Sequence, residues 1–165
     1  YLTIMLFEPH SLYTMRLAQK GELLTHNKDR NVLTLLKMDS VLETDFITIF
    51  PEMTLGELVK VISESKRNIF PVIDDFGHLI GIVQLDDLRE DMFKHEKWGN
   101  PITSYMIQPP DRILEKEQIQ EVLPRFEHNH TWMLPVVDKE NRYKGFISKS
   151  RILNAYREQL VNISQ

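Results

Sequence analysis

Pro71-Val72-Ile73-Asp74 is repeated later in the chain as Pro135-Val136-Val137-Asp138, and Gly81-Ile82-Val83 is repeated at the same distance as Gly145-Phe146-Ile147. We call this common distance, from Pro71 to Pro135 and from Gly81 to Gly145, the repeat offset. Short apolar and β-branched runs that are separated by a turn favour two neighbouring strands. Because both pairs of runs share the repeat offset, the sequence predicts two copies of one folding unit of about fifty residues.

An apolar stripe with helical spacing precedes each pair of strands. The stripe consists of Leu55, Leu58, Val59 and Ile62 in the first copy, and of Ile119, Val122, Leu123 and Phe126 in the second. Apolar residues three and four positions apart lie on one face of a helix. Thr54 is the expected N-cap of the first helix, and Glu57 has the spacing of a capping box.

Each copy therefore has the expected order strand, helix, strand, strand, helix. The expected elements of the first copy are 46–50, 54–66, 69–74, 79–84 and 86–93. Those of the second are 112–114, 117–128, 133–138, 143–148 and a helix from 150 onward. The expected fold class is α/β, with two βαββα repeats, short mixed sheets and N-terminal helices before them.

The sequence divides into four parts. They are residues 1–37 with expected helices at 9–20 and 28–37, a first repeat at 38–94, a linker at 95–103, and a second repeat with a C-terminal helix at 104–165. The linker is polar and contains Gly and Pro. It is short, so we expect the two repeats to pack against each other.

Composition limits the class of protein. The 165 residues are 42% hydrophobic and 27% charged, with a net charge of −4, which is ordinary for a globular protein and gives no footprint for nucleic acid. The chain has no Cys, so thiolate metal ligands and thiol nucleophiles are excluded. No apolar run approaches the roughly 20 residues that span a bilayer.

Residues for catalysis or metal binding are few. The carboxylate pairs Asp74-Asp75 and Asp86-Asp87 are adjacent in sequence rather than opposed, so general acid–base catalysis is not indicated. His128 and His130 are two residues apart, which matches no zinc-site spacing and favours a polar turn. The sequence predicts neither an enzyme nor a metal site.

The tandem arrangement resembles a CBS-domain pair, or Bateman module, over residues 38 to 160. Its signature is an apolar-Pro-Val strand followed by Gly-apolar-apolar-Thr/Ser-x-x-Asp/Asn. The first repeat has Phe70-Pro71-Val72 and Gly81-Ile-Val-Gln84-Leu-Asp86-Asp87. The second has Leu134-Pro135-Val136 and Gly145-Phe-Ile-Ser148-Lys-Ser150-Arg151. The resemblance implies a regulatory module with two clefts, each of which can hold AMP, ADP or ATP.

The resemblance places one candidate cleft at Asp87. An Asp at this position binds ribose hydroxyls in the family, and the base lies against the residues before the Pro-Val strand of the other repeat. The implied binding residues are Asp87, Gln84, Ile113, Thr131, Trp132 and Met133. Gln84 replaces the usual Thr or Ser. Asp86 adds negative charge where a polyphosphate would lie, so AMP or adenosine is favoured over ATP.

The second cleft departs from the pattern, because Arg151 stands where the ribose-binding Asp belongs. Arginine cannot accept a hydrogen bond. Arg67 and Asn68 could meet a phosphate together with Arg151, while Ser148 keeps the hydroxyl position. This cleft is expected to be degenerate, with one ligand per chain as the maximum.

Three of these residues also have a purely structural interpretation. Asp87 could equally be an N-terminal helix cap. Trp132 is expected to pack in the core between the repeats rather than to stack on a base. Arg151 is expected to be a solvated helix residue.

The N-terminal segment resembles the last membrane helix and connector of a bacterial ClC chloride channel or transporter. The resemblance rests on 7–14, on Arg16-Leu-Ala18 and on 21–26. It implies that Tyr13 would help to coordinate chloride in the full-length protein. In an isolated fragment Tyr13 is read as an apolar helix contact.

These resemblances predict the regulatory CBS pair of a ClC-type protein at the cytoplasmic face of the inner membrane, in a fragment that is itself soluble. The expected partners are the transmembrane domain of the same chain, a second copy in a homodimer, and an adenine nucleotide. The dimer is expected to form through apolar positions of the closing helices at Leu88, Met92, Ile152 and Tyr156. The alternatives are a nucleotide-sensing module of an enzyme such as IMP dehydrogenase, and a ligand-free dimerisation scaffold.

Overall fold

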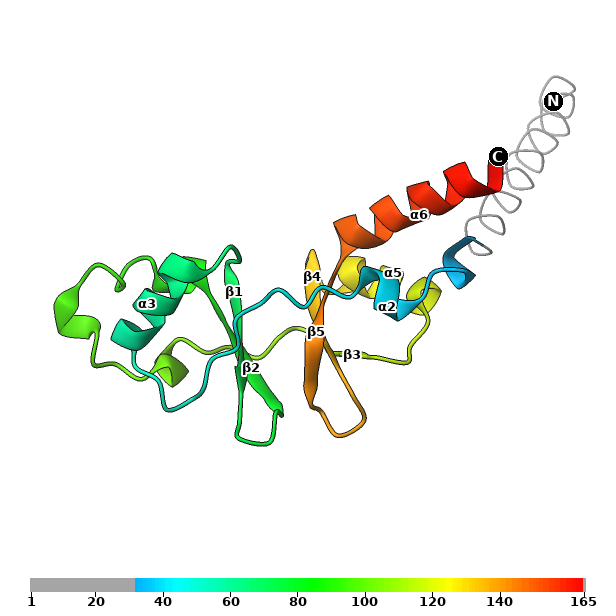
Figure 1. Ribbon diagram of the computed structural model, residues 1–165. Coiled ribbons are helices and arrows are strands. Elements are labelled where there is room, and N and C mark those ends of the chain that lie inside the picture. Colours follow the sequence, from blue (N-terminus) through cyan, green and yellow to red (C-terminus); the bar gives the residue numbers. More distant parts are fainter. Residues whose placement is uncertain (1–31, 165) are drawn as a thin grey trace, which may run out of the picture.

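The structure is a computed structural model, and it describes residues 32–164. The expected helix at 9–20, the first part of that at 28–37, and Tyr13 lie outside the described residues. Residues 32–34 are helical and the chain leaves the helix before Lys37, so the second helix ends earlier than expected. Figure 1 shows the strands of both repeats in the middle of the molecule, with α3 on one outer side and α2, α5 and α6 on the other.

The first repeat contains a two-stranded antiparallel sheet. Its elements are α3 (Leu55–Glu64), β1 (Ile69–Ile73), β2 (Leu79–Gln84) and α4 (Leu85–Leu88). Thr54 caps α3 as predicted, since its hydroxyl accepts the Glu57 N–H at 3.3 Å. The strand expected at 46–50 is reduced to one parallel bridge between Ile49 and Val72.

The second repeat contains three strands in the order β3-β4-β5. Its elements are β3 (Ile113–Leu114), α5 (Ile119–His128), β4 (Met133–Val137), β5 (Tyr143–Ser148) and α6 (Lys149–Ser164). β3 is parallel to β4, and β5 is antiparallel to β4. The pair Ile113–Val136 corresponds, at the repeat offset, to the Ile49–Val72 bridge of the first repeat. The mixed α/β fold of two short sheets is therefore confirmed.

The N-terminal segment of the first repeat and the segment that leads into the second repeat each pack on the other repeat. Met38, in α2 (Met38–Val41), is buried in the core of the second repeat with Ile113 and Ile152. Ile102, in the 3-10 helix η2 (Ile102–Ser104), is buried in the core of the first repeat. Each repeat thus receives its N-terminal segment from the other. The residues that form one compact unit in space are therefore not one continuous stretch of the sequence.

Two short extended segments make this exchange, and we call them the first strap (residues 42–46) and the second strap (residues 106–110). In the first strap, Glu43 exchanges both backbone hydrogen bonds with Phe146 of β5, at 2.8 and 2.9 Å. In the second, Ile107 exchanges both with Ile82 of β2, at 2.9 Å each. Each strap therefore extends the sheet of the opposite repeat by one bridge.

The straps explain the glycine of each repeat. A Cβ on Gly145 would lie 2.7 Å from the Glu43 carbonyl oxygen, and one on Gly81 would lie 3.0 Å from the Ile107 carbonyl oxygen. A strap can cross the strand this closely only where the strand has no side chain. The glycine in the sequence motif is thus a packing requirement of the exchange.

A third apolar core joins the two repeats. Its buried members are Phe46, Leu79, Ile82, Val137 and Phe146. The ring centroids of Phe46 and Phe146 lie 4.5 Å apart, so the first strap contributes directly to this core. Each such aromatic side chain stabilises the fold by roughly 1.5–3 kcal/mol on burial.

The two hairpin turns meet beside this core. Asp74 accepts the His78 N–H at 2.8 Å, and Asp138 accepts the Arg142 N–H at 2.8 Å. Between the turns, the Leu79 N–H donates to Asn141 and the Tyr143 N–H donates to Gly77, both at 2.9 Å. Gly77 has the expected positive φ of 86°.

The closing helix of the first repeat is shorter than expected, and the linker contains a helix of its own. The closing helix expected at 86–93 is only α4, and turns follow it. The linker at 95–103 contains the 3-10 helix η1 (His95–Lys97) and packs on α3, where the Gly56 N–H donates to the Trp98 carbonyl at 2.9 Å.

Two of the apolar positions expected to form a dimer are not available for it. Leu88 and Ile152 are fully buried within the chain, so they stabilise the single chain and cannot contact a second copy. Met92 and Tyr156 are partly buried against the same cores.

Candidate functional site

Asp87 lies in the first turn of α4 and is exposed. Within residues 32–164 its carboxylate has neither a hydrogen bond nor an ion pair, and Gln84 rather than Asp87 occupies the N-cap position. The interpretation of Asp87 as a helix cap is therefore wrong. A carboxylate without partners is available to accept hydrogen bonds from ligand hydroxyls.

Gln84 ends β2, directly before the helix that carries Asp87. Its side chain makes no capping bond, and in the strand register it lies opposite Ile69. Ile69 and Met133 both pack against the core between the repeats. The fold thus brings Gln84 of the first repeat and Met133 of the second to the border of one core.

Thr131 and Met133 form a local turn ahead of β4. The Thr131 hydroxyl donates to the Met133 carbonyl at 3.1 Å, which fixes the backbone at this point. Ile113 is fully buried in β3, so only its backbone could contact a ligand. Thr131 thus lies just before β4, Met133 begins it, and Ile113 lies in the neighbouring strand β3.

Trp132 is 71% exposed, so the prediction that it packs in the inter-repeat core is wrong. Its carbonyl accepts the Lys149 N–H at 3.0 Å, and the Lys149 ammonium lies 5.3 Å from the ring centroid. Asn68 has the corresponding place in the first repeat, where its carbonyl accepts the Leu85 N–H at 2.8 Å. An exposed indole is available for stacking on an aromatic base.

Asp86, beside Asp87, is paired with Arg89 at 3.1 Å on the surface. Both groups are well exposed, so this pair offsets little of the negative charge next to Asp87. The residues predicted for the first cleft therefore include an acceptor for hydroxyl groups but no cation for a phosphate chain.

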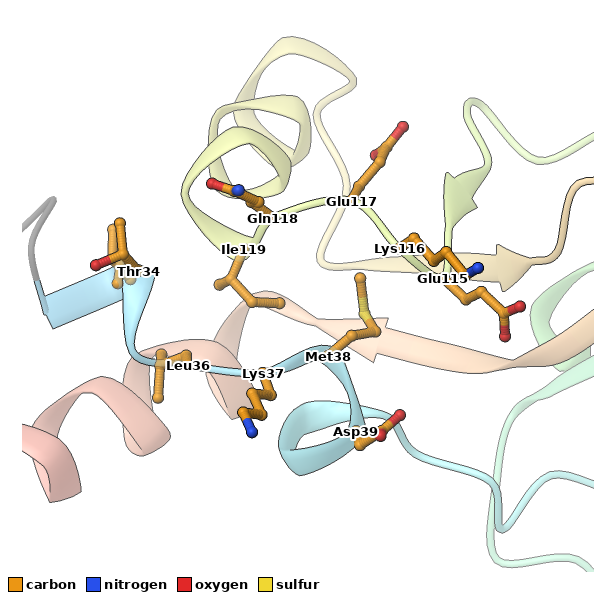
Figure 2. A pocket seen from close by; sticks show the side chains of 11 residues that line it. Thr34, Leu36, Lys37, Met38, Asp39, Glu115, Lys116, Glu117, Gln118 and Ile119 are labelled. Carbon is orange, nitrogen blue, oxygen red and sulfur yellow. The ribbon is translucent and has the colours of Figure 1, made fainter.

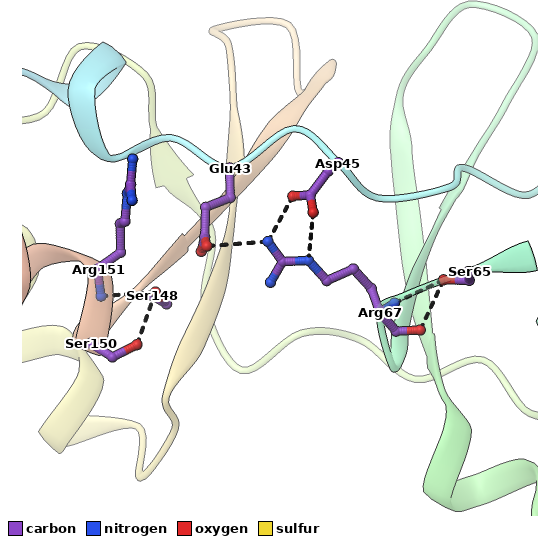
Figure 3. Close-up of polar contacts among 7 residues, drawn as sticks. All are labelled: Glu43, Asp45, Ser65, Arg67, Ser148, Ser150 and Arg151. Atoms are coloured by element: carbon purple, nitrogen blue, oxygen red, sulfur yellow. Dashed lines mark hydrogen bonds and ion pairs between the residues drawn. The ribbon is translucent and has the colours of Figure 1, made fainter.

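Arg67, predicted for the second cleft, is already paired with two carboxylates of the first strap. Its guanidinium donates to both oxygens of Asp45, at 2.7 and 3.0 Å, and to Glu43 at 3.2 Å (Figure 3). The hydrogen bond to Asp45 raises the pKa of Arg67, opposed by partial burial, and the same bond lowers the pKa of Asp45. The predicted use of Arg67 for a ligand phosphate thus competes with an internal carboxylate pair.

Ser148 and Arg151, predicted for the other side of the second cleft, lie at the end of β5 and in the first turn of α6. The Ser148 hydroxyl accepts the Arg151 N–H at 3.1 Å, so Ser148 satisfies an amide of the first turn. The Arg151 side chain is exposed, as expected for a solvated helix residue. Figure 3 shows Arg151 pointing away from Arg67 and its carboxylates.

Some hollows in the described part of the chain are lined by residues other than those predicted for either cleft. One, of about 410 Å³, is formed by 33–34, 36–39 and Glu115–Ile119. Figure 2 shows its mixed lining, with Asp39, Glu115 and Glu117 beside Lys37 and Lys116. Another, of about 330 Å³, lies at the turn between β4 and β5 and is lined by Lys139, Arg142 and Lys144 among others. Arg142 is bound to Asp138 at 2.9 Å, so its charge is largely used within the turn.

Within residues 32–164 no group of three or more His, Cys, Asp or Glu side chains could hold a metal ion. The same part of the chain has no helix that is both long and apolar enough to cross a bilayer.

Sequence reasoning missed Glu43 and Asp45. They lie in a segment without periodicity, and their role depends on the strap crossing between the repeats. The available signal was the repeat offset, since Glu43 corresponds to Ile107, which bridges the opposite repeat in the same way.

Comparison with known proteins identifies the family of the chain. The CBS domain family matches residues 38–94 and 102–158. An inosine-5'-monophosphate dehydrogenase from Methanocaldococcus jannaschii is 32% identical over 119 residues, which is 71% of this chain and 23% of that protein. The chain thus spans about a quarter of this relative.

Solved structures show the same fold. The CBS domain of a bacterial CNNM/CorC family Mg2+ transporter has a TM-score of 0.66 at 17% identity, covering 78% of this chain and 79% of that one. A CBS domain pair in complex with 5'-methylthioadenosine and S-adenosyl-L-methionine has a TM-score of 0.61 at 21% identity, covering 75% and 98%. With its duplicated motif, exchanged straps and matched sequence over both repeats, the chain belongs to the CBS domain family.

Proposed function

We propose that the chain is a regulatory module that binds one adenine nucleoside or nucleotide, AMP, ADP or ATP, in the cleft of Asp87. The observation that carries the proposal is the exposed Asp87 carboxylate, which has no partner in the described part of the chain. The related fold that holds two adenosine derivatives supports this class of ligand.

In this proposal the two sides of the cleft bind different parts of the ligand. Asp87 accepts the ribose hydroxyls, Gln84 lies beside them, and the edge formed by Thr131, Trp132 and Met133 receives the base. Charge-assisted hydrogen bonds to a carboxylate are stronger than neutral ones. Since Asp86 adds negative charge, AMP or adenosine should bind more tightly than ATP in the absence of magnesium.

Calorimetric titration with AMP, ADP and ATP tests the proposal. Asp87→Asn should weaken binding about tenfold to a hundredfold, because the lost charge-assisted contact is worth roughly 1.5–3 kcal/mol. The thermal midpoint should change little, since the Asp87 carboxylate makes no hydrogen bond or ion pair within residues 32–164. Asp86→Asn is the matched comparison, because it removes the same charge one residue away and should strengthen rather than weaken nucleotide binding.

A stoichiometry of one per chain is expected. Equal affinity in the wild type and Asp87→Asn would place the ligand elsewhere, and two ligands per chain would show that the second cleft also binds.

We propose further that the module belongs to a ClC-type chloride channel or transporter, at the cytoplasmic face of the inner membrane. The support is the resemblance of residues 7–26 to the end of such a membrane domain. Ligand binding would then act on transport only through different affinities for two arrangements of the repeats. Chloride flux measured with the module present and deleted, in liposomes with and without AMP, tests this attachment.

A second candidate is the regulatory module of an IMP dehydrogenase, favoured by the 32% identity to that enzyme's segment. The sequence before residue 1 distinguishes the two: successive apolar spans support the transporter, and alternating strands and helices support the enzyme.

A homodimer is part of the proposal in either case. Leu153 and Ile163 are exposed apolar residues of α6 and are candidates for contact with a second copy, unlike the fully buried Leu88 and Ile152. Sedimentation equilibrium at micromolar concentration tests it, and a monomer at all concentrations would contradict an intrinsic dimer.

A further inference from the structure

The hairpin turns of the two repeats lie at one edge of the molecule, the lower edge in Figure 1. The Tyr143 N–H donates to the Gly77 carbonyl and the Leu79 N–H donates to the Asn141 carbonyl, both at 2.9 Å. At the repeat offset Gly77 corresponds to Asn141 and Leu79 to Tyr143, so each bond is the counterpart of the other. The repeats are therefore related at this edge by an approximate two-fold axis.

Side chains at corresponding positions of this edge have opposite charges. We call Phe50, Glu52 and Asp75 the acidic face, and their counterparts at the repeat offset, Leu114, Lys116 and Lys139, the basic face. Phe50 and Leu114 are both exposed apolar residues, at 41% and 43%. The four charged side chains are exposed, and none of them has a hydrogen bond or an ion pair within residues 32–164. The chain thus carries opposite charges on two surfaces with the same backbone plan.

The basic face borders a hollow of about 330 Å³ at the turn between β4 and β5. Its lining includes Leu114, Glu115, Lys116, Lys139 and Lys144. The carboxylates of Asp138 and Glu140, which also line it, are paired with Arg142 at 2.9 and 3.3 Å. The ammonium groups of Lys116 and Lys139 therefore stay available to carboxylates of another molecule.

An aromatic side chain stands beside the acidic face. Phe76 follows Asp75 in the turn between β1 and β2 and is 79% exposed, whereas its counterpart at the repeat offset is Glu140. An exposed ring that enters a hollow is a common anchor of protein contacts, and paired charges around it fix the orientation. The acidic face and Phe76 together thus complement the hollow of the basic face, with its exposed Leu114.

We propose that the acidic face of one copy of the chain binds the basic face of a second copy, with Phe76 entering the hollow beside Leu114. Because both faces lie at one edge and are related by an approximate two-fold axis, two copies can make both contacts at once and close as a pair. Like charges disfavour the pairing of two acidic faces or of two basic faces. The contact uses neither α6 nor the Asp87 cleft, so it can fail while the proposed function holds.

Charge reversal on each face, followed by mixing, tests this contact. Asp75→Lys places a lysine opposite Lys139, and Lys139→Glu places a glutamate opposite Asp75. In sedimentation equilibrium each variant alone should associate at least about tenfold more weakly than the wild type, because a closed pair contains the altered contact twice. An equimolar mixture of the two variants should regain most of the association, since every reversed residue then faces an opposite charge.

The matched controls are Glu90→Lys and Lys97→Glu, which make the same changes of net charge at exposed residues away from this edge. They should leave the association unchanged. The thermal midpoint of Asp75→Lys and of Lys139→Glu should equal that of the wild type, since neither side chain has a partner in the described part of the chain. A wild type that stays monomeric, variants that associate as tightly as the wild type, or a mixture no tighter than its components would each overturn the contact.

Disulfide cross-linking locates the contact, because the chain has no cysteine of its own. Copies with Asp75→Cys are mixed with copies with Lys139→Cys and oxidised. The mixed disulfide should form in excess over the two like pairs, and adding Phe76→Ala to both copies should reduce its yield because the hollow then loses its anchor. The three products in statistical proportion, as random collision or association through α6 would give, would overturn the proposal.

Discussion

The two repeats have the same backbone plan, but the second is stabilised by charges where the first is apolar. In the second repeat, Arg125 donates to Asp111 at 2.7 Å and is also paired with Glu117. The corresponding positions of the first repeat, at the repeat offset, are Val61, Ile47 and Met53. Ion triads and apolar groups can replace each other in a protein interior, provided that each set is complete.

The places where the repeats do not differ are equally informative. Glycine is present at both strap crossings, and an Asp whose carboxylate accepts two backbone amides is present in both hairpin turns. At these glycine and aspartate positions the backbone geometry allows only one residue type. The neighbouring side chains, by contrast, differ between the repeats.

The largest effect is expected at the strap crossings. Gly145→Ala should lower the free energy of unfolding by about 3 kcal/mol, because its Cβ would meet a backbone oxygen and its φ of 154° is unfavourable for a side chain. Gly81→Ala should cost about 1–2 kcal/mol, since the nearest atoms belong to the Met106 side chain, which can rotate. Urea denaturation of both variants measures the difference. Equal costs would show that the two straps are equally adaptable.

Removing one member of the ion triad Arg125, Asp111 and Glu117 should lower the free energy of unfolding more than replacing all three. Arg125→Met leaves the carboxylates of Asp111 and Glu117, 29% and 26% exposed, without their cation and should cost about 2 kcal/mol. The triple change Arg125→Val, Asp111→Ile and Glu117→Met copies the first repeat and should recover most of this loss. Urea midpoints measure both. A triple variant less stable than Arg125→Met would mean that the two sites do not tolerate the same apolar set.

Acid should affect α5 of the second repeat before α3 of the first. The hydrogen bond from Arg125 lowers the pKa of Asp111, opposed by partial burial. Because the folded pKa lies below the unfolded value, the stability from this pair is present above about pH 4 and is lost as the pH falls further. Amides of α5 should therefore lose protection from exchange at a higher pH than those of α3. Arg125→Met should remove the difference, whereas a difference that persists would point to another carboxylate.

The smallest effect on stability is expected at the exposed indole. Trp132→Ala removes little packing and a cation–π contact with Lys149, so it should cost no more than about 0.5 kcal/mol. Binding of AMP should weaken more clearly if the indole receives the base. Thermal denaturation and titration of the same variant separate the two. A large loss of stability would show that Trp132 has a structural role in spite of its exposure.

Much of the fold could be predicted because its signals are local. The repeat offset revealed the duplication, alternating and helical apolar patterns indicated the strands and α3 and α5, and Thr54 indicated a cap. Such features depend on neighbours in the chain, so periodicity and turn chemistry reveal them. The candidate residues of the Asp87 cleft came from resemblance and stay a prediction.

The tertiary structure decided what depends on distant parts of the chain. It decided that Trp132 is exposed, that Leu88 and Ile152 are internal, and that Arg67 is bound by carboxylates of the first strap, Asp45 and Glu43. The physical reason is the exchange of the two straps, which brings Glu43 and Asp45 between the repeats. Burial and ion pairing follow from the position of a residue in space, and no local pattern in this sequence specifies that crossing.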